Sequence, residues 1–330
     1  MNISPKDLND AWEEIAAKVD PRTDGPYLYI QLKGGNLPIG AILRSSDRRP
    51  GLLVRFPATS LEQLPRPDSG RGFSFERPVA AGNGTLGLPI LLSDPSVKDL
   101  FAAMGADLVA EVEKSDSEAS AAHRVLRRIA LWRRFLQRRE GLLSNEEVRG
   151  LFGELHVLSL TISKRGIDEA LEAWHGPERE LHDFKFNEGI IEVKAWRAES
   201  GAKIYISHAD QIAVDSQKPM QLAAVQISTG GTGTIGMTLP ETIRQLSDKM
   251  NGIQVQKFDE LLAAYGYIDL HANEYHDRMQ VLGLDVYEVS EGFPHIDTRS
   301  IPGGIANLKY TIELGSLESF RINSSDIICK

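Results

Sequence analysis

The sequence predicts a mixed α/β protein (α+β mixed) in which a β-rich segment precedes a core of helices and strands. Three observations favour this class. Short runs of alternating polar and apolar residues fill residues 27–92, helices with clear start signals follow, and residues 180–196 have the pattern of two paired strands. We therefore expect four parts: a β-rich N-terminal module over 1–93, a helical connector with a basic helix over 94–140, a core over 141–250, and an α+β C-terminal extension over 251–330.

Composition excludes several classes of protein. The chain has 330 residues, 42% of them hydrophobic and 25% charged, which is ordinary for a globular protein with a sizeable core. Its single cysteine, Cys329, excludes an internal disulfide framework and a cysteine-based zinc cluster. The sequence has no secretory signal pattern and no apolar run of ~18 residues, so we expect a cytoplasmic protein without membrane contact. A net charge of −9 means that any nucleic-acid contact needs a local basic zone.

The first element should be a helix from Pro5 to about Val19. Ser4 suits its N-cap, Pro5 its first position and Asp7 its first turn. Clusters of Gly, Pro and Asp then separate short strands, which we expect at 27–32, 37–43, 51–56, 72–75 and 88–92.

A basic helix ends the connector. Its apolar stripe recurs at helical spacing and predicts one buried face: Val125, Ile129, Trp132 and Leu136. The other side carries a row of arginines: Arg124, Arg127, Arg128, Arg134, Arg138 and Arg139. Such a row can follow a phosphate backbone and so bind DNA. A solvated face with intramolecular ion pairs would give the same pattern, and both interpretations stay open.

The core begins with a helix that Ser144 and Glu147 start as a capping box. Its apolar stripe runs from Val148 to Ile162. Glu154 borders that stripe, so this acid either has a partner or serves a site. The paired strands follow, and then come a third strand at 203–207, a short helix with Gln211, and a buried strand at 221–228. The order is helix, three strands, helix, strand.

The two paired strands carry acids on one face. In an antiparallel pair with an even-length connection centred between Asn187 and Glu188, Asp183 lies directly opposite Glu192, and Lys194 shares the Glu192 face. Opposed carboxylates repel and destabilise a sheet. A hard divalent cation between them would explain the arrangement, because such ions prefer oxygen ligands. A solvated hairpin with alternating charges is the alternative.

Two other patterns are weaker candidates for a functional site. Residues 231–236 read G-x-G-x-x-G, a dinucleotide-binding pattern, but the capping box at Thr238 starts the next helix only after the last glycine. We therefore expect a flexible loop there. His271, Glu274, His276 and Asp277 have the residue types of metal ligands but no metal-site spacing, so we expect them to be solvated.

The spacing of Asp183, Glu192 and Lys194 resembles the active-site signature of the PD-(D/E)XK nuclease superfamily, with His182 replacing the proline. The order of elements is similar to that superfamily's restriction-endonuclease-like αβββαβ core. Further segments look like a bacterial branch often encoded among restriction–modification or phage-defence genes: Gly153-Glu154-Leu155, Trp174-His175-Gly176-Pro177, His182-Asp183-Phe184 and Ile191-Glu192-Val193-Lys194.

This resemblance implies an endonuclease that cleaves DNA with Mg²⁺, for which Mn²⁺ can substitute. Asp183, Glu192 and the main-chain carbonyl of Val193 would bind the metal, and Glu154 would hold a second metal or a water. Lys194 would orient the attacking water, and Gln211 matches a glutamine found near the site in some members. Implied partners are DNA, a methyltransferase or other restriction-system subunits, and a second copy in a homodimer. The alternative is a catalytically silent DNA-binding or scaffolding subunit.

Overall fold

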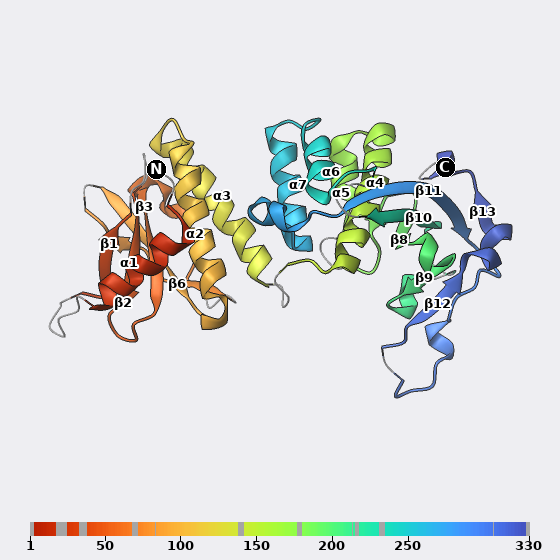
Figure 1. Cartoon of the computed structure of the whole chain (residues 1–330), viewed down its shortest axis with the longest axis horizontal. Helices are drawn as coiled ribbons and strands as arrows, with labels where there is room; N and C mark the ends of the chain where they lie inside the picture. Colours follow the sequence, from red (N-terminus) through yellow and green to blue (C-terminus); the bar gives the residue numbers. More distant parts are fainter. Residues whose placement is uncertain are drawn as a thin grey trace. The chain divides into compact units, whose positions relative to one another are not determined.

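The chain forms two compact units, Met1–Arg139 and Glu140–Lys330 (Figure 1). This computed structural model describes residues 3–17, 25–32, 38–67, 72–82, 84–137, 142–176, 180–212, 214, 218–230, 235–305 and 307–327. The division into four parts that the sequence predicts (1–93, 94–140, 141–250 and 251–330) stays a prediction.

Unit 1 combines an antiparallel sheet with helices. Its strands are β1 (Tyr27–Gln31), β2 (Ile39–Arg44), β3 (Pro50–Pro57), β4 (Phe73–Phe75), β5 (Val79–Ala80) and β6 (Thr85–Leu92). Its helices are α1 (Pro5–Ala17), α2 (Lys98–Glu113) and α3 (Glu118–Gln137), with 3₁₀ turns at Ala58–Gln63 and Pro95–Val97. In the described residues the sheet order is β1-β2-β3-β6-β4, and β5 pairs with β6. The strands expected from the sequence are present, and β5 is an addition.

Aromatic packing fixes α1 on this sheet. Trp12 is buried and stacks on Phe101 of α2, with ring centroids 5.7 Å apart. Its indole nitrogen donates to the carbonyl oxygen of Gly51 at 2.9 Å, so the buried polar atom is satisfied.

The arginine row of α3 makes ion pairs within unit 1. Arg124 lies 2.9 Å from Glu111, and Arg128 forms an ion pair with Asp107. Both acids belong to α2. Arg127 is half-buried. The side chain of Arg134 and the whole of Arg138 and Arg139 lie outside the described residues. The expected apolar stripe is confirmed where it is described, because Val125, Ile129 and Trp132 are buried.

Unit 2 contains a second sheet with helices on one face. Its helices are α4 (Asn145–Arg165), α5 (Ile167–Ala173), α6 (Leu239–Ser247) and α7 (Gly252–Tyr265). Its strands are β7 (Phe184–Lys185), β8 (Ile190–Trp196), β9 (Lys203–Ile206), β10 (Met220–Gly230), β11 (Arg278–Val289), β12 (Tyr310–Glu313) and β13 (Arg321–Ile322). Six 3₁₀ turns are described: Ala198–Ser200, Ala209–Gln211, Asp269–Glu274, Thr298–Ser300, Leu314–Phe320 and Ser324–Asp326.

The main sheet of unit 2 has the order β13-β11-β10-β8-β7 over the described strands. β8 and β10 run parallel, and the other neighbouring pairs are antiparallel. One face carries Ile191 and Val193 and packs in a common core with residues of α4, α5, α6 and α7. The opposite face, with Leu222 and Ala224 of β10, packs against β9, β12 and the turn at Leu314–Phe320. Figure 1 shows these helices on one side of the sheet and the β9–β12 pair on the other.

The mixed α/β class is confirmed, but two elements differ from expectation. β9 is not a neighbour of β8 in the sheet, because it pairs with β12 from the C-terminal part. A single bridge joins Trp174 to Phe184, so beyond β10 the sheet continues through β8 and β7 to Trp174. The expected second helix is only a 3₁₀ turn at Ala209–Gln211 in the described residues. The position of β9 arises from pairing with residues about a hundred positions away, which a local pattern does not record.

Helix α4 is fixed at its start and against the sheet. Ser144 Oγ accepts from the Glu147 amide at 3.3 Å, and the Glu147 carboxylate accepts from the Ser144 amide at 2.9 Å, which confirms the capping box. Gly153 faces β8, and a Cβ there would lie 3.2 Å from the Cβ of Ala195. The glycine therefore permits the close approach that brings Glu154 to the sheet.

Within the described part of the chain, no helix combines the length and apolar character needed to cross a bilayer.

Replacing Ser144 with Ala should lower the free energy of unfolding of unit 2 by about 1 kcal/mol, because the helix start loses its side-chain acceptor. Ser163→Ala is the matched control. Ser163 is an exposed serine inside the same helix that bonds only the Ser159 carbonyl, so its loss should be nearly neutral. Urea unfolding followed by circular dichroism measures both changes, and equal effects would contradict the capping role.

Candidate functional site

The strand pair β7–β8 has the register that the sequence predicts. Phe184 pairs with Ile191 and Lys185 with Ile190, and the Phe186 amide donates to the Gly189 carbonyl at 2.8 Å. The connection is therefore even in length. Continuing this register sets Asp183 opposite Glu192.

Asp183 directly precedes β7, which begins at Phe184. Its side chain bonds the main-chain amide of Val193 in β8. The Asp183 carboxylate oxygen Oδ2 accepts from that amide at 2.8 Å. This bond fixes the acid against β8 through the main chain. The carbonyl of Val193, expected as a metal ligand, belongs to this same residue.

Glu192 and Lys194 form a covered ion pair on the face opposite the helices. Glu192 is 0% exposed, and its Oε1 lies 2.6 Å from Lys194 Nζ, whose side chain is 15% exposed. This contact has the distance of an ion pair but not the angles of a hydrogen bond. Neither Glu192 oxygen accepts a hydrogen bond of ordinary geometry from any donor in the described residues. A buried carboxylate in this state is costly unless another ligand satisfies it.

Gln211 reaches this pair from the 3₁₀ turn. Its Oε1 accepts from Lys194 Nζ at 3.2 Å and from Ser207 Oγ at 2.9 Å. It also accepts from the amides of Ser207 and His208. One side-chain oxygen therefore ties the segment after β9 to the lysine.

Glu154 approaches Asp183 from α4. It is 6% exposed, and its Oε2 accepts from Trp174 Nε1 at 2.8 Å. The Tyr265 hydroxyl, at the end of α7, also hydrogen-bonds Glu154. Sequence analysis missed Tyr265, because it lies in a later helix with no motif around it. Trp174 belongs to the segment Trp174-His175-Gly176-Pro177 of the family resemblance, but only the fold shows that it bonds Glu154.

Gly176 makes room for both acids. A Cβ at this position would lie 2.2 Å from Glu154 Oε2 and 3.1 Å from Asp183 Oδ1. Both oxygens therefore border the space that a side chain would fill. The amides of His175 and Gly176 donate to the Asp183 carbonyl at 2.8 and 3.1 Å, which holds this segment in place.

His182 differs from expectation. In a regular strand it would point to the face opposite Asp183, but it is buried near the main chain of Gln211 and the charges of Lys185 and Lys194. Burial lowers the pKa of His182, and the charges of Lys185 and Lys194 lower it further. The reason is that residues 181–183 form a bend, so strand alternation does not apply to them.

The charges of these groups affect one another. Burial and then the charge of Asp183 raise the pKa of Glu154 well above its usual value, against the hydrogen bonds of Trp174 and Tyr265. Burial, reinforced by Asp183, raises the pKa of Glu192 to about 8, although Lys194 opposes this.

The other two groups follow the same logic. Burial raises the pKa of Asp183, although Lys194 and the Val193 amide act against it. Burial alone would lower the pKa of Lys194, but the charges of Glu192 and Asp183 raise it above its usual value. The site is therefore a concentration of acids that a single lysine neutralises incompletely.

The acids suit a hard cation because they are carboxylates and because they lie near one another. Carboxylate oxygens are the ligands such ions prefer, and the two oxygens of Glu192 lack hydrogen bonds. Among the described residues, however, no three His, Cys, Asp or Glu side chains already form a closed ligand set. Lys194, at 2.6 Å from Glu192, would have to move for a cation to approach that acid.

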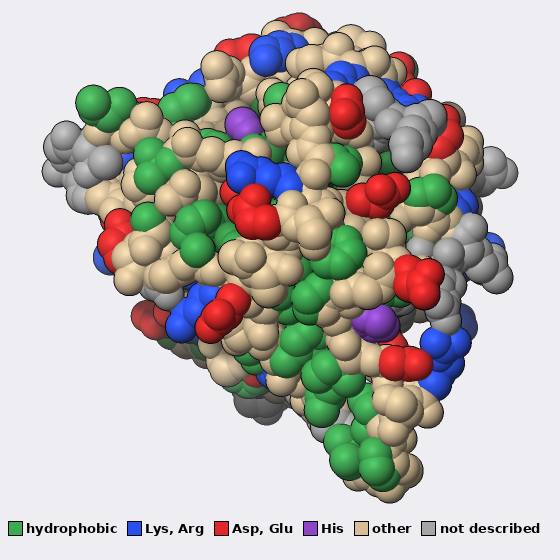
Figure 2. Space-filling model, turned by 90° about the vertical axis from the view of Figure 1, so that its right-hand side faces the viewer, with side chains coloured by type: hydrophobic (Ala, Val, Ile, Leu, Met, Phe, Trp, Pro, Cys, Tyr) green, Lys and Arg blue, Asp and Glu red, His purple; other side chains and the backbone are tan. Residues whose placement is uncertain are grey.

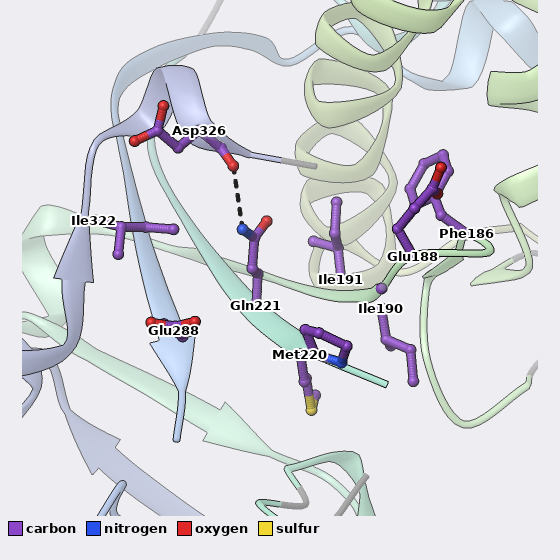
Figure 3. Close-up of a pocket in the computed structure, with 11 residues that line it drawn as sticks. Phe186, Glu188, Ile190, Ile191, Met220, Gln221, Glu288, Ile322 and Asp326 are labelled. Atoms are coloured by element: carbon purple, nitrogen blue, oxygen red, sulfur yellow. Dashed lines mark hydrogen bonds between the residues drawn. The ribbon is translucent and has the colours of Figure 1, made fainter. Parts of the chain in front are cut away.

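A pocket at the start of β8 and β10 is separate from the acids. It has a volume of about 140 Å³ and is lined by Phe186, Ile190, Ile191, Met220 and Ile322 with acidic groups at its rim. Figure 3 shows Gln221 of this pocket bonded to the main chain of Asp326. None of Glu154, Asp183 and Glu192 lines it.

The structure describes the remaining sequence patterns only in part. Residues 231–234 of the glycine pattern lie outside the described residues, and α6 starts after Thr238 as expected. His271 and Glu274 lie in a 3₁₀ turn, and His276 and Asp277 follow it. Cys329 lies outside the described residues.

Comparison with known proteins identifies the family. Searches of curated proteins and of solved structures gave no match. A family profile matches residues 8–315, nearly the whole sequence. The chain therefore belongs to DUF4420, the family described as "Putative PD-(D/E)XK family member".

Proposed function

We propose that this protein is a metal-dependent endonuclease that hydrolyses phosphodiester bonds of DNA. The observation that carries the proposal is the meeting of Asp183, Glu192 and Lys194 in one covered place, where Glu192 is 0% exposed and its Oε1 lies 2.6 Å from Lys194 Nζ. Membership of a PD-(D/E)XK-like family supports the same class of chemistry.

The metal would be held by Asp183 and Glu192, with the carbonyl of Val193 and Glu154 as further ligands. A bound Mg²⁺ or Mn²⁺ supplies charge that polarises the phosphate and makes water more acidic. The excess of acid over base at the site supports this assignment, because mutual repulsion favours a cation.

Lys194 would orient the attacking water and stabilise charge that develops on the phosphate oxygens. Its raised pKa keeps it an ammonium, which suits a donor and not a base. Gln211, at 3.2 Å, would hold the ammonium once Glu192 has turned to another ligand.

DNA is the proposed substrate, and its contacts remain a proposal. Arg124 and Arg128 already pair with acids of α2, and Arg127, Arg134 and Arg138 complete the proposed row. Figure 2 views one face of the molecule, on which Lys and Arg side chains stand singly or beside acids. A methyltransferase or other restriction-system subunit, and a second copy of the chain, are proposed partners in phage defence.

A catalytically silent scaffold is the second candidate. The observation that favours it is the covering of Glu192, which is 0% exposed and paired with Lys194. A silent protein would neither bind Mn²⁺ nor cleave plasmid DNA.

Lys194→Ala should reduce Mg²⁺-dependent plasmid cleavage by about 10²-fold or more, because a preorganised charge next to the phosphate is lost. Lys185→Ala is the control, since Lys185 lies on the same strand pair and contacts only Glu180 among the acids of the described residues. Lys194→Ala should retain Mn²⁺ binding in calorimetry. Equal cleavage by both variants would exclude the proposed role.

Gly176→Ala should weaken Mn²⁺ binding and cleavage by about 10–100-fold, because the new Cβ would displace the Glu154 carboxylate. Gly252→Ala provides the control, since a Cβ there meets no described atom within 4 Å. Calorimetric Mn²⁺ titration of both variants makes the comparison. A Gly176→Ala protein with wild-type affinity would contradict the shared position of the acids.

Mn²⁺ affinity should fall by about tenfold per pH unit as pH is lowered from 8 to 6, because a proton then competes for Glu192. The sign follows from the raised pKa of about 8, below which the metal-free acid is protonated. Titration in buffers of different ionisation enthalpy should show proton release on binding. Affinity that does not change over this range would count against Glu192 as a ligand.

A further inference from the structure

Glu154 is held by neutral donors that come from different elements. Among the described residues, Trp174 Nε1 lies 2.8 Å from its Oε2, and the Tyr265 hydroxyl lies beside Gly150, one turn earlier on α4, from where it lowers the Glu154 pKa by hydrogen bonding. No described Lys or Arg forms an ion pair with Glu154. Neutral donors fix the direction of a carboxylate but leave it its charge, so it can still attract a cation.

Helix α7 supports both donors. Its residue Phe258 contacts Trp174 with ring centroids 6.0 Å apart, and Tyr265 is the last residue of the helix. These two residues are seven apart and so share a helix face. The helix ends at this point because Gly266 has φ 115° and its amide donates to the Leu262 carbonyl. The end of α7 therefore fixes the position of the Tyr265 phenol.

Two glycines leave space for this arrangement. Gly150 lies one turn before Glu154 on α4, and a Cβ there would lie 3.2 Å from the Tyr265 hydroxyl oxygen. Gly176 leaves the space beside Glu154 Oε2. Side chains at these positions would push the phenol or the carboxylate away, so the local backbone is shaped around the contact.

We propose that Tyr265 and Trp174 are positioning residues that hold the Glu154 carboxylate toward Asp183 for cation binding. The inference rests on the proposed function. It makes α7, which lies outside the expected core, a necessary part of the site. Groups that orient a metal ligand in this way typically change metal affinity by about 10–100-fold when they are removed.

The first test is Mn²⁺ calorimetry on the full chain. Tyr265→Phe keeps the ring and removes the hydroxyl, and its Kd should rise about tenfold or more. Tyr267→Phe is the matched control, because Tyr267 is also buried and also bonds a carboxylate, that of Asp269. Thermal unfolding of both variants measures the cost to stability. Equal Kd values for the two variants overturn the proposal.

A double-variant cycle tests whether the donors act on the same group. Trp174→Phe should also weaken binding, and the pair Trp174→Phe with Tyr265→Phe should lose less than the combined single effects. Strict additivity would mean that the two residues act independently, and it overturns the shared role.

A measurement without metal separates the outcomes. The indole N–H proton resonance of Trp174, assigned with Trp174→Phe, should shift in Tyr265→Phe and in Glu154→Gln but not in Tyr267→Phe. No shift in Tyr265→Phe overturns the positioning contact itself. If the shift occurs but the wild-type protein neither binds Mn²⁺ nor cleaves DNA, the proposed function fails, and the cation role of the contact fails with it.

Discussion

The structure of unit 2 depends on holding like charges together in a covered place. Burial raises the pKa values of Asp183, Glu192 and Glu154, and the charge of Asp183 raises those of both glutamates further. Lys194, at 2.6 Å from Glu192, relieves only part of this repulsion. Placing acids away from water is unfavourable unless a proton, a lysine or a metal compensates. The surrounding fold must therefore provide the stability that the site lacks, and a large shared core on the helix side does so.

Backbone features arrange these groups. The Asp183 carboxylate, directly before β7, accepts from the Val193 amide of β8, and Gly176 leaves space for two carboxylate oxygens. Gly153 brings α4 close to β8. At Gly153 and Gly176 the absence of a Cβ lets neighbouring groups come nearer than ordinary packing allows.

Charge elsewhere in the chain has a more modest role. The arginines of α3 that are described with ion pairs, Arg124 and Arg128, contact acids of the neighbouring helix, as expected of a solvated helix face. The Arg128–Asp107 pair is largely covered, whereas the Arg124 side chain is 42% exposed. Exposed ion pairs contribute little stability and can exchange partners at low cost. Arg124 is therefore the described arginine of these two that remains compatible with phosphate binding, and salt-dependent DNA affinity is the property that separates the two roles.

Local signals in the sequence were enough to determine the start of α4 and the register of β7 with β8, because capping and alternation act over a few residues. The family resemblance added Gln211 to the expected site, which Glu154 also borders. Local signals did not determine that β9 pairs with β12, that His182 turns toward Gln211, or that Tyr265 reaches Glu154 from α7. Those contacts join segments far apart in the chain, and only packing of the whole unit decides which distant groups meet.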